Sequence, residues 1–174
     1  QRMEDLITHA VAAGVRVVNM SLGSNRESQW TAFEYAALRH PELLFVVSAG
    51  NNSRNIDLEP VYPAVLPLEN MLVVSSVASD GYPAEGANWG KESVDLLVPG
   101  EHIAALNFLG ETVEVSGSSY AAARVTALAA RILLSTPDLT AAELRDEILS
   151  LAQPAPGNFV RHGLIAEPSD LVRQ

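Results

Sequence analysis

The sequence predicts an α/β fold: three layers, with a mostly parallel β-sheet flanked by helices. Short apolar runs rich in β-branched residues alternate with segments whose apolar residues recur every three or four positions. This alternation is expected when buried strands are joined by amphipathic helices. Tight turns with glycine or proline separate the segments, as in β-α-β units. A chain of 174 residues is long enough for one domain with a sizeable core and too short for two large ones.

The strands are predicted from short, nearly continuous apolar runs. A strand that is covered on both faces has no polar face, so it loses the alternation of polar and apolar residues. In chain order, the runs cover residues 15–22, 43–50, 71–78 and 93–100. A polar and apolar alternation over 112–115 predicts one further strand.

The helices are predicted from apolar residues at helical spacing and from their end signals. Gly14 ends the first helix, which contains Met3, and Pro41 closes the second, which starts near Trp30. The last helix, 141–151, follows a capping box formed by Thr140 and Glu143. A long helix of small apolar residues covers 120–134, and the proline-rich segment 51–70 is expected to be a loop.

Composition excludes several classes of partner. The net charge of −10 argues against nucleic acid and anionic lipid, which both need a basic surface. No apolar run reaches the ~20 residues that span a membrane. Without cysteine there is neither a disulfide nor a thiolate metal site. Because the chain opens within a helix and lacks an initiator methionine, we expect it to be part of a longer protein.

Small polar residues and glycines follow two predicted strands and precede the long helix. The carboxyl ends of parallel strands meet at one edge of the sheet, where ligands bind. A serine at a helix N-terminus can serve as a nucleophile, and an asparagine amide can donate to an oxyanion. The three segments are Asn19–Gly23, Ser48–Asn52 and Gly117–Ser119.

Each of these residues also has a purely structural interpretation. Asn51 and Asn52 form an ordinary turn pair, and Ser118 or Ser119 can cap the helix that follows. Single residues therefore do not separate catalysis from structure, and the order of several motifs along the chain has to be considered.

That order resembles the subtilisin-like serine proteases (subtilases, peptidase S8). The motifs are "NMSLG" (19–23), "SAGN" (48–51), "YPAVLPLENMLVVSSVA" (62–78), "VDLLVPGEHI" (94–103), "GSSYA" (117–121) and "RHGLIAEPSDLV" (161–172). Together they extend over nearly the whole chain.

The resemblance implies acyl transfer to a serine, followed by hydrolysis of the acyl-enzyme. Ser119 matches the nucleophile and Asn51 the oxyanion-hole asparagine. The remaining matches concern the peptide substrate. Ser21, Leu22 and Gly23 match the edge segment that pairs with its main chain, and Ala49 and Gly50 match the pocket for the residue before the scissile bond. Tyr120 stands at the variable position of the nucleophile motif, where methionine is common in the family, so its contacts with this pocket are expected to differ.

The catalytic aspartate and histidine of the family have no match in this sequence. No Asp-Ser/Thr-Gly and no His-Gly-Thr/Ser motif is present. The four histidines lack the family context: His9, His40, His102 and His162. Residues 1–174 therefore resemble the C-terminal part of a subtilase catalytic domain, and the N-terminal part is expected to supply both groups. We expect this chain alone to be inactive.

No cofactor is expected. The family often binds calcium, but the acidic loop residues Asp57, Glu59, Glu69 and Asp80 form no recognisable ligand set, so no metal is assigned. The resemblance implies secretion or another location outside the cytoplasm.

Two alternative functions remain. An α/β-hydrolase would use Ser119, then Asp138 or Asp146, then His162, so its triad would be complete in this chain. Its nucleophile elbow requires glycine where Ala121 stands, and further strands should follow the serine. A degenerate protease or a non-catalytic module would only bind peptides along Ser21–Gly23. Ser119→Ala would abolish hydrolysis and leave peptide binding intact.

Overall fold

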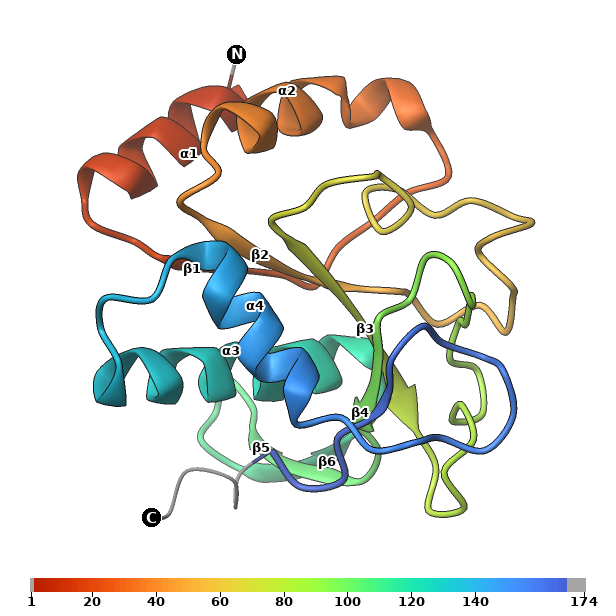
Figure 1. Cartoon of the computed structure of the whole chain (residues 1–174). Coiled ribbons are helices and arrows are strands. Elements are labelled where there is room, and N and C mark those ends of the chain that lie inside the picture. The colour runs from red at the N-terminus through yellow and green to blue at the C-terminus, as the bar shows by residue number, and fades with distance from the viewer. Residues whose placement is uncertain (1, 169–174) are drawn as a thin grey trace.

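The computed structural model describes residues 2–168, and these form three layers with a sheet between two pairs of helices (Figure 1). The predicted α/β fold is confirmed. In chain order the elements are α1 (Arg2–Ala12), β1 (Val17–Met20), the 3-10 helix η1 (Glu27–Gln29), α2 (Thr31–Arg39), β2 (Leu44–Ser48), β3 (Met71–Val77), β4 (Leu96–Pro99), β5 (Ile103–Leu106), β6 (Thr112–Val115), α3 (Ser118–Ser135), α4 (Ala141–Ser150) and β7 (Gly163–Leu164).

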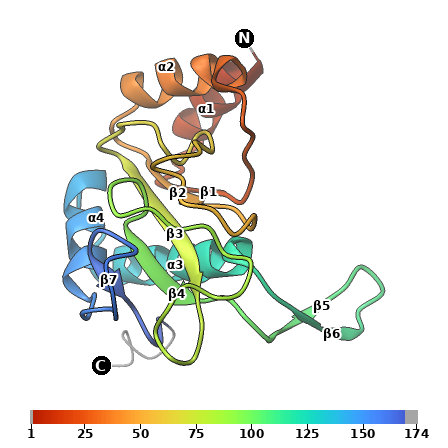
Figure 2. The same ribbon diagram turned by 90° about the vertical axis from the view of Figure 1, so that its right-hand side faces the viewer.

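The main sheet has five parallel strands in the order β1-β2-β3-β4-β7. Its central strands are apolar on both faces because helices cover both. Along β2, Phe45 and Val47 join the core under α1 and α2, while Leu44 and Val46 join the core under α3 and α4. Strands β5 and β6 form a separate antiparallel ribbon that projects from the body (Figure 2).

Helix α3 determines where the candidate nucleophile lies. Its buried face consists mostly of small residues, including Ala121, Ala122, Val125 and Ala129. Small side chains let a helix approach a sheet closely, and α3 contacts all of β1, β2, β3 and β4. The helix therefore lies across the sheet, and its N-terminus is held at the carboxyl end of β4, where Gly117 N–H donates to Gly100 O (2.9 Å).

Three element predictions differ from the structure. A strand does follow the serine, but β7 has only two residues, too few to give a pattern in the sequence. Strand β5 was not predicted because its four residues are all apolar, so the alternation of its buried and exposed positions leaves no pattern in the sequence. Helix α3 begins at Ser118, earlier than expected, because the first helical turn needs no characteristic residue.

The capping box that was predicted before α4 is present. Thr140 N–H donates to Glu143 Oε2 (2.8 Å), and Glu143 N–H donates to Thr140 Oγ1 (3.2 Å). No helix in residues 2–168 is long and apolar enough to cross a membrane. The last part of the motif at 161–172, residues 169–172, lies outside the described residues.

Candidate active site

The structure brings the segments after β1, β2 and β4 to the N-terminus of α3. Ser119, the second residue of α3, is partly buried. The Ser21 hydroxyl, just after β1, donates to the carbonyl oxygen of Ser119 (3.1 Å). Leu22 and Gly23 follow Ser21 and are exposed, and Tyr120 is next to Ser119 in α3. The predicted nucleophile thus lies beside the predicted substrate segment.

Asn51 contacts the first turn of α3 directly. Its Oδ1 accepts a hydrogen bond from the Ser118 N–H (2.9 Å), which satisfies one of the free backbone donors at the helix start. A Cβ at Gly117 would lie 3.1 Å from Asn51 Nδ2, and Gly117 has a φ of 132°, so glycine is the residue that permits this approach. Since Asn51 is exposed, its Nδ2 hydrogens remain available to a ligand.

Ser118, the residue before Ser119, has a structural role. Ser118 is fully buried, and its Oγ accepts a hydrogen bond from the Gly50 N–H (3.2 Å). It does not cap α3, whose N-cap is Gly117 without a side-chain hydrogen bond. The capping interpretation therefore fails for Ser118. Ala49, at the end of β2, is also fully buried.

This arrangement can stabilise a negatively charged oxygen. The Ser119 N–H belongs to the first turn of α3, where backbone donors have no partner within the helix. Together with Asn51 Nδ2 it provides two hydrogen-bond donors at the positive end of an 18-residue helix. Acyl transfer needs this combination of nucleophile and oxyanion donors.

Comparison with protein families gives a match to the Subtilase family over residues 1–164. The chain belongs to the subtilase family. Curated relatives include subtilisin-like protease 6 of Trichophyton tonsurans (35% identical over 124 residues) and of Trichophyton schoenleinii (36% over 124 residues). Both alignments cover 71% of this chain and 29% of the relative, so the chain spans less than a third of these proteins.

Solved structures show the same subtilase fold. A cold adapted subtilisin-like serine proteinase is 25% identical with a TM-score of 0.77, covering 94% of this chain and 61% of that one. MycP1 with its N-terminal propeptide removed is 25% identical, with a TM-score of 0.74 and coverages of 95% and 64%. The prenylagaramide maturation protease PagA, at 24% identity and a TM-score of 0.73, shares the fold over 88% and 57%.

In this subtilase, His162 lies far from Ser119. Its backbone N–H donates to Asp95 O (3.0 Å), and Asp95 directly precedes β4. Ser119 lies at the other end of β4, where the hydrogen bond from Gly117 N–H to Gly100 O holds the start of α3. Four strand residues separate the two ends by roughly 13 Å. The α/β-hydrolase alternative needs Ser119 and His162 in contact, and the structure does not bring them together.

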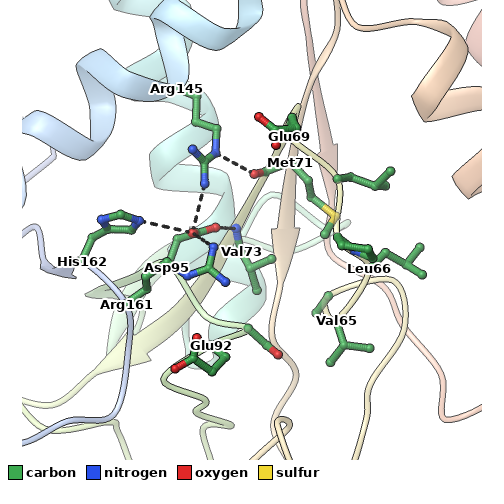
Figure 3. Close-up of a pocket in the computed structure, with 14 residues that line it drawn as sticks. Val65, Leu66, Glu69, Met71, Val73, Glu92, Asp95, Arg145, Arg161 and His162 are labelled. Carbon is green, nitrogen blue, oxygen red and sulfur yellow. Dashed lines mark hydrogen bonds and ion pairs between the residues drawn. The ribbon is translucent and has the colours of Figure 1, made fainter.

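His162 instead borders a pocket of about 620 Å³ at the amino ends of β3 and β4 (Figure 3). Asp95, 3% exposed, lines this pocket and accepts from Val73 N–H (2.8 Å), Arg145 (3.2 Å) and Arg161 (3.4 Å). His162 Nε2 lies 3.7 Å from the same carboxylate. Burial nevertheless lowers the His162 pKa, and the two guanidinium groups lower it further, outweighing the attraction of Asp95.

The other histidines also lie elsewhere in the subtilase fold. His9 is in the last turn of α1, His40 contacts Glu42 (2.9 Å), and His102 contacts Glu114 (2.8 Å). Within residues 2–168, no group of three or more histidine or carboxylate side chains is arranged to hold a metal ion.

One site residue was missed by the sequence analysis. Asn88, in the loop between β3 and β4, is fully buried and forms hydrogen bonds with the segment that carries Asn51. It belongs to none of the motifs considered, and the only available signal was a polar residue directly between the apolar residues Ala87 and Trp89.

Proposed function

We propose that this chain carries the nucleophile and oxyanion hole of a subtilisin-like serine endopeptidase that hydrolyses peptide bonds through an acyl-enzyme on Ser119. The observation that carries the proposal is the hydrogen bond from Ser118 N–H to Asn51 Oδ1 (2.9 Å), which holds an asparagine amide at the N-terminus of α3 beside the serine. Membership of the subtilase family supports it.

In the proposed reaction, Ser119 Oγ attacks the carbonyl carbon of the scissile peptide and its proton passes to a histidine base. The resulting oxyanion accepts hydrogen bonds from Asn51 Nδ2 and from the Ser119 N–H. Collapse of the tetrahedral intermediate breaks the C–N bond, and the amine leaves with the proton from the histidine. Water then hydrolyses the serine ester by the same steps.

The histidine and its aspartate partner are proposed to come from an N-terminal part of the same catalytic domain, outside this sequence. The coverage supports this, because the chain corresponds to 61% of one subtilisin-like proteinase and to 29% of the curated relatives. The positions of the four histidines support it as well. Without a base the serine is a weak nucleophile, so this chain alone would be inactive.

The proposed substrate is a peptide or protein whose main chain pairs with Ser21, Leu22 and Gly23 as an added strand. Leu22 is 51% exposed, which leaves this segment accessible. Gly50 and Tyr120, which are partly exposed, would line the pocket for the residue before the scissile bond, and the fully buried Ala49 would belong to it only as the residue preceding Gly50. We infer from the family alone that the protein acts outside the cytoplasm.

Labelling with a fluorophosphonate, located by mass spectrometry, tests the proposal. The full-length protein should label at Ser119, its Ser119→Ala variant should not, and residues 1–174, once shown to be folded, should not. Labelling of residues 1–174 alone would place a base within them and contradict the half-domain proposal. If the full-length protein binds peptides without labelling, the chain is a peptide-binding module or a degenerate protease.

A further inference from the structure

Asn88 forms side-chain hydrogen bonds with three backbone groups of the segment that contains Asn51. Its Nδ2 donates to Ala49 O (2.8 Å), and its Oδ1 accepts from the N–H groups of Asn52 (2.8 Å) and Arg54 (3.2 Å). These groups lie on both sides of Asn51 in the chain. The Asn88 side chain is fully buried, and its removal would take away the partner of these three backbone groups.

The backbone of Asn88 strengthens the same connection. Its N–H donates to Gly50 O (3.0 Å), so residues immediately before and after Asn51 are bound to one asparagine. A Cβ at Gly50 would lie only 2.7 Å from Asn88 Nδ2, and Gly50 has a φ of 95°. The glycine therefore allows the amide to reach the turn after β2.

Asn88 is itself anchored to the middle of the sheet. The hydroxyl of Ser75, a fully buried residue of the central strand β3, donates to Asn88 O. The adjacent Trp89 N–H donates to Arg54 O (3.0 Å), and Ser53 N–H donates to Gly86 O (2.8 Å). The loop around Asn88 thus runs beside the Asn51 segment and connects it to a rigid strand.

We propose that Asn88 is a positioning residue for hydrolysis: it fixes the backbone around Asn51 so that the Asn51 amide stays at the N-terminus of α3. The inference rests on the proposed function of Ser119 and Asn51. Only an amide suits the position, because it donates to one carbonyl and accepts from two N–H groups at once. Aspartate would keep the oxygen that accepts from both N–H groups, but it would lose the N–H donor and place a second oxygen against Ala49 O.

The kinetic test compares Asn88→Ala and Asn88→Asp with the wild type in the full-length protein, using a peptide p-nitroanilide. Displacement of Asn51 should lower kcat by about 10- to 100-fold and leave KM within about twofold, since the oxyanion donor acts mainly in the transition state. If Asn88→Ala does not yield folded protein, the isosteric Asn88→Asp provides the same comparison.

Asn70→Ala is the matched control. Asn70 is also buried, at 8% exposure, and its Nδ2 donates to Ala37 O and His40 O (3.0 Å each), on the α2 side of the molecule. This variant should lower Tm and leave kcat unchanged. Equal kcat values for the Asn88 variants and Asn70→Ala would overturn the proposal, because the Asn88 effect would then be one of stability alone.

A double variant tests whether Asn88 acts through Asn51. In an Asn51→Ala background, Asn88→Ala should lower kcat by less than about twofold, because the group that it positions is absent. An undiminished loss of kcat in that background would overturn the proposed route.

Amide hydrogen exchange separates this inference from the proposed function. Exchange at Asn52 and Arg54 should be faster in the Asn88 variants than in the wild type and in Asn70→Ala, whether or not the protein hydrolyses peptides. Unchanged exchange at both amides would overturn the positioning role. Hydrolysis that persists in Ser119→Ala would instead overturn the proposed function.

Discussion

At the scale of single residues, the site depends on a reciprocal pair of hydrogen bonds between the end of β2 and the start of α3. Gly50 N–H donates to Ser118 Oγ, and Ser118 N–H donates to Asn51 Oδ1. The two segments are almost seventy positions apart in sequence, and short polar side chains hold them together. The Ser119 side chain takes part in neither of these hydrogen bonds, as expected for a proposed nucleophile.

The oxyanion role of Asn51 can be separated from its structural role with Asn51→Asp. The aspartate keeps an oxygen to accept from Ser118 N–H and loses the Nδ2 donor. In the full-length protein, kcat should fall by about 10²- to 10³-fold, as for loss of one oxyanion donor, with little change in Tm. Steady-state kinetics and calorimetry measure both quantities. A fall in kcat of less than tenfold would contradict the oxyanion role.

His162 should make stability depend on pH in a defined direction. Burial, with help from Arg145 and Arg161, lowers its pKa in the folded protein, so the unfolded chain binds a proton first on acidification. The stabilisation that comes from keeping His162 neutral is fully present above the pKa of the unfolded chain, about 6.5. It is lost as the pH falls from there through the lower pKa of the folded protein. Tm measured from about pH 7.5 to about pH 5 should fall more steeply for the wild type than for His162→Gln.

The exposed His9→Gln variant serves as the control for this titration. Equal slopes of Tm against pH in the wild type and His162→Gln would show that the environment of His162 does not disfavour its charged form.

The sequence allowed only part of the site to be predicted. Ser119 and Asn51 stand in motifs, so their proximity followed from the family resemblance. Asn88 lies 36 positions from Asn52 and accepts a hydrogen bond from its backbone N–H. Any residue except proline has such an N–H group, so the sequence gives no sign of this contact. The position of His162 depends on which end of β4 the C-terminal segment reaches, and the sequence does not show this.

At the scale of elements, prediction worked where a feature is local. The capping box before α4 was found because its two residues are three positions apart and satisfy each other. The two-residue β7 was missed because it is defined by pairing with distant residues, Leu96 and Leu97 of β4 and Gln153. Short strands of this kind are fixed by their partners and not by their own residues.

The cap of α4 gives a stability prediction. Thr140→Ala removes the acceptor for the Glu143 N–H and should lower the free energy of unfolding by about 1 kcal/mol, while Thr140→Ser should have little effect. Urea denaturation of the two variants measures the difference. Equal destabilisation by alanine and serine would mean that the hydroxyl does not stabilise the helix.

At the scale of the whole molecule, Asp95 connects elements that are distant in sequence. It joins β3 through Val73, α4 through Arg145 and the C-terminal segment through Arg161 (Figure 3). Asp95→Ala leaves the partly buried Arg145 and the buried Val73 N–H without this partner, so the free energy of unfolding should fall by about 3 kcal/mol. Asp146→Ala, on the exposed side of α4, provides the control in the same denaturation experiment.

The edge of the sheet provides a test of how this chain joins the rest of its protein. Strand β1 pairs only with β2 within residues 2–168. Arg16 O accepts from Leu44 N–H, so the backbone groups of Val18 also face β2, and those of Val17 and Asn19 face away. If an N-terminal part supplies the catalytic histidine and aspartate, a natural place for its strands is this edge, next to Ser21.

Amide exchange should then be slow at Val18 in both forms and slow at Val17 and Asn19 only in the full-length protein. Fast exchange at Val17 and Asn19 in the full-length protein would show that β1 is also an edge there. The missing catalytic groups would then have to approach Ser119 from the loops and not from the sheet.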